Sequence, residues 1–136
     1  MAFVVDTSVA LKWFLADEDD RAGSLALLKS ISDTNRPVVP WLCFYEIGNA
    51  LIVAVRRKRI DFDQVEEIVR MLEEMPIDID SSDRVELLRL THLARKHALT
   101  TYDAAYLALA LREKLPLATS DQALKKAALA EGVTVI

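Results

Sequence analysis

The chain has 136 residues, of which 52% are hydrophobic and 28% charged, a balance that excludes a disordered tail and suits one domain spanning 1–136. The single cysteine excludes an internal disulfide framework, and the net charge of −4 argues against nucleic-acid binding through a basic surface. No signal-peptide pattern opens the chain and no run approaches the ~20 apolar residues of a membrane span, so we expect a cytoplasmic protein.

The first half of the chain alternates short apolar runs with segments whose apolar residues recur at helical spacing. These patterns predict strands at 3–6 and 37–40, and helices at 8–15, 20–31, 41–57 and 63–74. Ser8 is expected to be the N-cap of the first helix, because its hydroxyl suits that position.

The second half continues the alternation. It predicts strands at 77–79, 115–119 and 133–136, and helices at 82–97, 101–113 and 121–131. The helix at 101–113 is apolar nearly all round, so protein should enclose it. Short apolar strands that alternate with helices imply an α/β fold, in which helices cover both faces of a parallel sheet.

Four acidic residues stand out against this pattern. Asp6 and Asp121 each follow a predicted strand, at the sheet edge where α/β proteins bind ligands, and Asp103 lies in the first turn of an apolar helix. The helix dipole would by itself explain Asp103 and Asp121, and it explains Asp6 less well. Glu46 lies well inside a predicted helix with no cation one turn away, so it is either a half-exposed glutamate on a solvated edge or part of a site.

A metal site accounts for all four acids together. Carboxylates brought close to one another repel unless a cation neutralises them, and oxygen ligands without histidine or thiolate partners favour Mg²⁺ or Mn²⁺. Such a site suits phosphodiester hydrolysis, because the metal lowers the pKa of a bound water and stabilises charge on the phosphoryl oxygens. We therefore predict that the catalytic and metal-binding residues are Asp6, Glu46, Asp103 and Asp121.

Four motifs around these acids also resemble one family. DTSVALKWF, EIGNAL, TTYDAAYLALA and LPLATSDQAL occur in this order across the chain, and together they resemble the PIN domain, specifically the VapC-type toxin ribonucleases of toxin–antitoxin pairs. The resemblance implies a three-layer α/β/α domain with a five-stranded parallel sheet. It also implies a Mg²⁺- or Mn²⁺-dependent endoribonuclease that uses the same four acids and takes RNA as its substrate.

The resemblance extends to supporting residues and partners. Ser8, Asn49 and Thr101 match positions that support the acids in the family. Ala123 stands where some relatives carry a further acid, so any second metal is expected to be held weakly. A homodimer and a cognate VapB-type antitoxin that occludes the active site are also implied.

Two further features leave alternatives open. The basic run at 56–59 either stays solvated at a helix C-terminus or contacts RNA or an acidic partner; it comprises Arg56, Arg57, Lys58 and Arg59. Trp13, Phe14 and Trp41 belong either to the core or to a groove that binds an antitoxin helix.

The alternative function is a PIN-fold protein-binding module without catalytic activity, and the presence of all four acids argues against it. A phosphatase that forms an aspartyl-phosphate would need a second acid two residues past Asp6, where Ser8 stands.

Overall fold

The computed structural model describes residues 1–80 and 86–136. The strands are β1 (Ala2–Val5), β2 (Arg36–Val39), β3 (Asp78–Ile79) and β4 (Leu117–Ala118). The helices are α1 (Thr7–Phe14), α2 (Ala22–Ser30), α3 (Leu42–Arg56), α4 (Phe62–Glu74), α5 (Leu87–His97), α6 (Thr101–Glu113) and α7 (Gln122–Ala130). Most predicted bounds are confirmed to within two residues. The predicted helix at 82–97 is confirmed from Leu87 onward, and positions 82–85 lie outside the described residues.

All strand pairs in the sheet are parallel, in the order β3-β2-β1-β4, which confirms the predicted α/β class. The prediction of five strands is wrong for the described residues. The segment predicted at 133–136 contributes one isolated bridge, between Val135 and Leu117. Both hydrogen bonds of this bridge involve Leu117, whose N–H donates to the carbonyl of Thr134 and whose carbonyl accepts from the N–H of Ile136. A single bridge of this kind does not form a strand.

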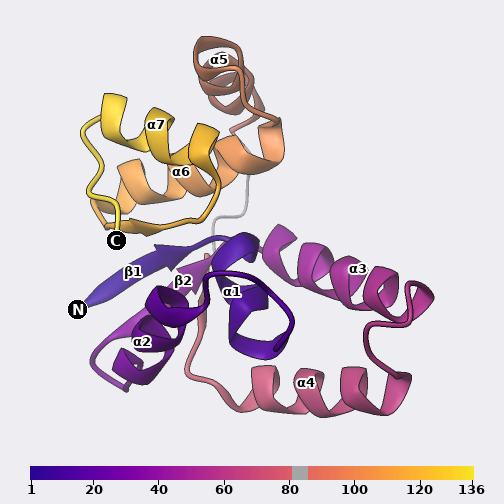
Figure 1. The fold of residues 1–136 in the computed structure, drawn as a ribbon. Helices are drawn as coiled ribbons and strands as arrows, with labels where there is room; N and C mark the ends of the chain where they lie inside the picture. The colour runs from indigo at the N-terminus through magenta and orange to yellow at the C-terminus, as the bar shows by residue number, and fades with distance from the viewer. Residues whose placement is uncertain (81–85) are drawn as a thin grey trace.

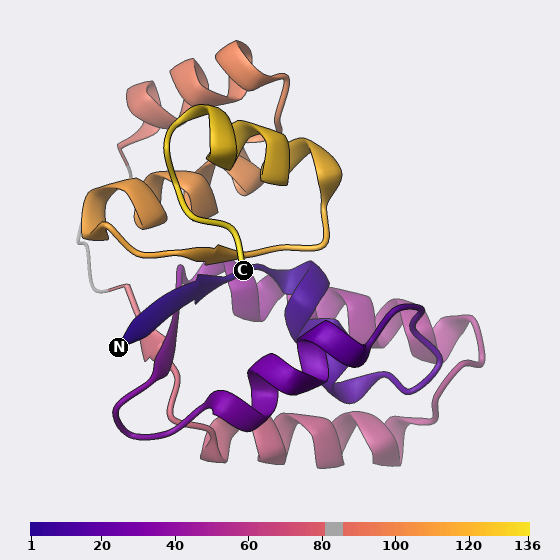
Figure 2. The same ribbon diagram turned by 60° about the vertical axis from the view of Figure 1, so that its left-hand side comes forward.

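Helices cover the sheet on both faces. Figures 1 and 2 show α5, α6 and α7 on one side and α1, α2, α3 and α4 on the other. Phe3, Val4 and Val5 of the central strand β1 are at most 2% exposed, which explains their continuous apolar run. The expected enclosure of α6 is confirmed by its run of buried residues from Tyr106 to Ala110. No helix in the described ranges has the length and apolar character needed to cross a bilayer.

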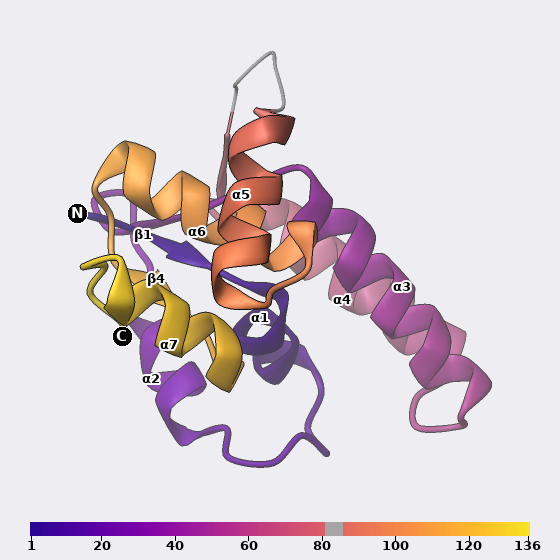
Figure 3. The same ribbon diagram turned by 90° about the horizontal axis from the view of Figure 1, so that it is seen from above.

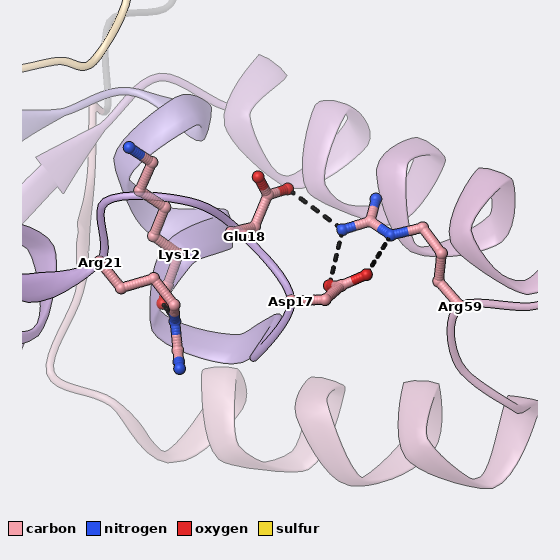
Figure 4. Close-up of polar contacts among 5 residues, drawn as sticks. All are labelled: Lys12, Asp17, Glu18, Arg21 and Arg59. Carbon is pink, nitrogen blue, oxygen red and sulfur yellow. Dashed lines mark hydrogen bonds and ion pairs between the residues drawn. The ribbon is translucent and has the colours of Figure 1, made fainter.

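Helices α3 and α4 project together from the body of the domain, as Figure 3 shows. At the turn between them, Arg59 binds the loop between α1 and α2 (Figure 4). Its Nε lies 2.7 Å from Oδ2 of Asp17, and its Nη2 lies 2.8 Å from Oδ1 of Asp17 and 3.4 Å from Oε1 of Glu18. The hydrogen bonds from Arg59 lower the pKa of Asp17. One member of the basic run therefore joins two loops.

The other members of the basic run, Arg56, Arg57 and Lys58, are exposed, and within the described ranges no ion pair involves them. Whether they contact a partner stays open. The tryptophans that the sequence singled out differ in their exposure. Trp13 is buried, and its indole N–H donates to the carbonyl of Ser24 at 2.8 Å. Trp41, in contrast, is 60% exposed.

Candidate active site

Asp6 directly follows β1 and is the N-cap of α1, and it is only 4% exposed. Its Oδ1 accepts from the backbone N–H of Val9 at 3.2 Å and from the hydroxyl of Ser8 at 2.5 Å. Its Oδ2 accepts from the hydroxyl of Thr119 at 2.6 Å. Burial raises the pKa of Asp6 and the charge of Asp103 raises it further, while the three hydrogen bonds act in the opposite direction. The prediction that Ser8 caps the helix is wrong, because the carboxylate two residues earlier reaches the free N–H group.

The end of β4 is tied to the end of β1 by two hydroxyl groups. The Oγ atom of Ser8 accepts from the N–H of Ser120 at 3.0 Å, and the Oγ1 atom of Thr119 accepts from the N–H of Asp121 at 3.0 Å. Asp121 in turn is the N-cap of α7, where its Oδ1 accepts from the N–H of Leu124 at 2.8 Å. The predicted rim at the carboxyl ends of the strands is therefore a connected hydrogen-bonded structure.

Glu46 is half-buried on α3 and is held by two hydroxyl groups. Tyr106 donates to its Oε1 at 2.6 Å, and Thr7 donates to the same oxygen at 3.1 Å. The nearby thiol of Cys43 is buried; burial raises its pKa to about 11, with smaller contributions from the charges of Glu46 and Asp6. Glu46 is thus half-exposed, as the first alternative has it, but its carboxylate is bound by two hydroxyl groups of neighbouring elements.

Asp103 connects the acids electrostatically. Burial is the largest cause that raises the pKa of Asp103, and the charges of Asp121 and Glu46 raise it further. A hydrogen bond from Thr100 lowers this pKa. Asp103 also contributes to the raised pKa of Asp6. Carboxylates from four separate elements therefore act on one another. Within the described ranges, however, no three carboxylate, imidazole or thiol side chains are arranged so that they could hold a metal ion.

The predicted supporting residues differ in what they contact. Ser8 binds Asp6 directly, as described above. Asn49 is exposed, and in the described part of the chain it makes no hydrogen bond to the acids. Thr101 begins α6, but the N-cap of this helix is Thr100, whose Oγ1 accepts from the N–H of Asp103 at 3.1 Å.

Three hydroxyl groups that hold the acids were missed by sequence reasoning: those of Thr7, Tyr106 and Thr119. Two of them had a local signal, because Thr7 follows Asp6 directly and Thr119 precedes Asp121 by two positions. Tyr106 had the weaker signal of a phenol within an apolar run, since a buried tyrosine usually needs a hydrogen-bond partner.

A family model for the PIN domain matches residues 3–129. The chain belongs to the PIN domain family. The resemblance to the PIN domain that the motifs indicated is confirmed at this level. No curated protein sequence matches this chain.

Solved structures share this PIN fold at low sequence identity. VapC20 of Mycobacterium tuberculosis, described as a sarcin–ricin-loop-cleaving toxin, has a TM-score of 0.69 and 14% identity, covering 92% of this chain and 94% of that one. FitAcB of Neisseria gonorrhoeae has a TM-score of 0.67 and 18% identity, covering 100% and 96%. VapBC2 of Rickettsia felis, bound to a DNA fragment from its promoter, has a TM-score of 0.64 and 15% identity, covering 100% and 98%. At these identities the likeness is one of fold alone.

Proposed function

We propose that this PIN-domain protein is a divalent-metal-dependent endoribonuclease whose catalytic and metal-binding residues are Asp6, Glu46, Asp103 and Asp121. The observation that carries the proposal is the gathering of these carboxylates at one edge of the sheet, where hydrogen bonds through Thr119 connect Asp6 with Asp121. Burial is the main cause of the raised pKa of Asp6 and of Asp103, and the charges of the neighbouring acids raise both further. A divalent cation would relieve that repulsion. A donor set made only of carboxylate oxygens fits Mg²⁺ or Mn²⁺ better than a softer metal.

The chain's own side chains fix two of the four acids. Ser8 and Thr119 hold Asp6, and Tyr106 holds Glu46, so neither carboxylate turns freely. When bound, the cation would lower the pKa of the attacking water and neutralise charge on the phosphoryl oxygens. Because no three of the acids are arranged as ligands in the described residues, metal binding requires some of these side chains to turn toward a common point.

The biological role that we propose is that of the toxin in a toxin–antitoxin pair. The support is the resemblance of the four motifs to VapC-type toxins and the fold shared with VapC20 and VapBC2. This role brings a VapB-type antitoxin as the partner that occludes the site, a homodimer as the working form, and the cytoplasm as the location.

The test is cleavage of RNA by the purified protein. We expect cleavage to require added Mg²⁺ or Mn²⁺, to stop with EDTA, and to leave 5′-phosphate and 3′-hydroxyl ends. A 2′,3′-cyclic phosphate product would mean that the 2′-hydroxyl of the RNA attacked, and the proposed mechanism would be wrong. Expression of the wild type and of Asp6→Asn in a bacterium, with mapping of RNA 5′ ends, would identify the substrate and test the toxin role.

The second candidate function is a non-catalytic binding module with the same fold. The absence of a preformed metal-holding group among the described residues favours it. Calorimetric titration with Mg²⁺ and Mn²⁺ separates the two functions, since a module without catalytic activity would bind neither ion at these acids. Asp103→Asn is the matched control, because heat that persists in this variant comes from elsewhere in the protein.

A further inference from the structure

A cavity of about 610 Å³ lies among α1, α2, α7 and the end of β4, and it adjoins the candidate active site through its wall. Two residues of the lining donate to the carboxylate of Asp6: Val9 through its N–H at 3.2 Å and Thr119 through its hydroxyl at 2.6 Å. A third, Ser120, donates its N–H to the hydroxyl of Ser8, which itself binds Asp6. The wall of the cavity is therefore bonded directly to an acid of the candidate site.

Two lysines in this lining have no carboxylate partner. Lys12 of α1 is half-buried, and its Nζ lies 3.4 Å from the backbone carbonyl oxygen of Asp20, an uncharged acceptor. Figure 4 shows Lys12 apart from the ion pair of Arg59. Lys125 lies near the start of α7 and is exposed. Within 1–80 and 86–136 neither lysine forms an ion pair, not even with the carboxylate of Asp20 in the same lining. Both ammonium groups can therefore bind an anion.

A buried hydroxyl of the lining also lacks a partner. Ser24 of α2 is 7% exposed, and its carbonyl accepts from the indole of Trp13. Its hydroxyl makes no hydrogen bond to any residue that the structure describes. Buried polar side chains are nearly always hydrogen-bonded, to protein or to a bound molecule. Because Ser24 lines the cavity, an occupant of the cavity can provide the missing partner.

The donors of this cavity fit a phosphate group. Lysine binds phosphate as a point charge, and a hydroxyl can donate to one of the remaining phosphate oxygens. The acids of the candidate site repel any anion that approaches them, so a phosphate near Asp6 needs positive charge beside it. Lys12 and Lys125 provide that charge in the cavity whose wall is bonded to Asp6.

We propose that this cavity binds a phosphate group of the RNA strand next to the bond that is cut, with Lys12 and Lys125 as the cationic ligands and Ser24 as a further donor. The inference rests on the proposed nuclease function and adds to it a subsite that positions the strand, since phosphate contacts fix the register of a nucleic acid. Free phosphate has the same chemistry, and an acidic peptide is a competing occupant. The test below separates these three ligands.

The experiment measures binding of a short RNA oligomer to the Asp103→Asn variant with Mg²⁺ present. This background keeps the RNA intact, and Asp103 does not line the cavity. Lys12→Gln and Lys125→Gln are each compared with it over a range of salt concentrations. Each variant should lower the slope of log K against log salt by about 0.7, the contribution of one phosphate contact to a single strand. The weakening should therefore shrink roughly threefold between about 50 and about 200 mM salt.

The helix α7 offers a matched control. Lys126→Gln removes an exposed cation at the next position, which does not line the cavity, and it should leave the slope unchanged. Lys125→Arg keeps the charge and should keep the slope. Circular dichroism of every variant confirms that each is folded.

A second probe locates the phosphate that the cavity binds. Neutral methylphosphonate groups replace the phosphates of the oligomer one at a time. One replacement, beside the bond that the wild type cuts, should weaken binding most in the Asp103→Asn parent. Lys12→Gln and Lys125→Gln should lose this sensitivity at that position, which a purely structural role of the lysines would leave in place.

The inference is overturned if both lysine variants keep the slope of the parent, or if Lys126→Gln lowers it as much. It is also overturned if the lysine variants weaken binding of inorganic phosphate or of polyglutamate and leave RNA binding unchanged, since the cavity would then serve free phosphate or an acidic partner. RNA that binds through the lysines but is never cut by the wild type would refute the nuclease proposal and leave this one standing. RNA that is cut while neither lysine affects its binding would do the reverse.

Discussion

The hydroxyl of Tyr106 donates a hydrogen bond to Oε1 of Glu46 across 2.6 Å, and this contact joins α6 to α3 at the candidate active site. Tyr106 is 1% exposed, and burial raises its pKa, so the phenol keeps its proton and remains a donor. The hydroxyl of Thr7 lies 2.9 Å from the hydroxyl of Tyr106 and completes a small, partly buried cluster. One tyrosine therefore serves both the packing of the core and the orientation of an acid.

We expect Tyr106→Phe to lower the free energy of unfolding by about 1 to 2 kcal/mol, because Glu46 loses a partly buried, charge-assisted hydrogen bond. Urea unfolding measures the change. Tyr102→Phe is the matched control on the same helix, and it should be neutral because that side chain is 63% exposed. Equal unfolding midpoints for the two variants would mean that the bond to Glu46 contributes nothing.

Asp103→Asn should separate activity from stability. Cleavage should fall by roughly 100-fold or more, because the acid coupled to the other three is lost. The raised pKa of Asp103 means that its charge costs stability as the pH rises above its ordinary value of 3.8. Without metal, the variant should therefore be as stable as the wild type at low pH and more stable near pH 7. Thermal unfolding at both pH values measures this, and a variant that is less stable at pH 7 would contradict it.

Glu131 connects the end of α7 to the end of α5. Its Oε1 lies 2.8 Å from Nε2 of His97 and 2.9 Å from Nζ of Lys96, and these hydrogen bonds lower the pKa of Glu131. A lowered pKa stabilises the fold above the ordinary value of 4.5, and this contribution is lost as the pH falls through the folded-state pKa.

Glu131→Gln should accordingly cost about 0.5 to 1 kcal/mol at pH 7 and progressively less below pH 4.5. Urea unfolding across this range provides the measurement. Glu66→Gln is the control, because its partner Arg70 is 71% exposed and the pair lies on the surface of α4. A difference between Glu131→Gln and the wild type that stays constant with pH would rule out the assigned cause.

Arg59→Ala should loosen the loop between α1 and α2. The guanidinium binds both carboxylate oxygens of Asp17, a geometry that lysine cannot reproduce. We expect faster proteolytic cutting of that loop, with an effect that shrinks at high salt because the pair is partly exposed. Arg57→Ala is the matched control, an exposed cation of the same run with no ion pair among the described residues. Equal cutting rates in the two variants would contradict the role of Arg59.

The sequence allowed the rim of the sheet to be predicted, because Asp6 and Asp121 follow apolar strands and the carboxyl ends of parallel strands meet at one edge. The prediction of Ser8 as the N-cap of α1 was wrong for a local reason. Aspartate and serine are equally good N-cap residues, and only the path of the chain shows that Asp6 reaches the N–H of Val9.

The partners of Glu46 could not be predicted in the same way. Tyr106 lies 60 positions away, and its hydroxyl reaches the carboxylate only because α3 and α6 pack at one place along their lengths. Helical periodicity gives the buried face of each helix but not where two helices meet. The prediction of a fifth strand was wrong for a similar reason. An apolar stretch such as that around Val135 does not reveal how many of its residues pair with a neighbouring strand.

The hydroxyl of Thr119 donates to Asp6, which lies 113 positions earlier in the chain, and accepts from the backbone N–H of Asp121. During synthesis on the ribosome, Asp6 emerges long before the strand that completes its surroundings. The acidic cluster therefore cannot assemble until nearly the whole polypeptide has been released, and a shortened translation product that stops before β4 would lack it.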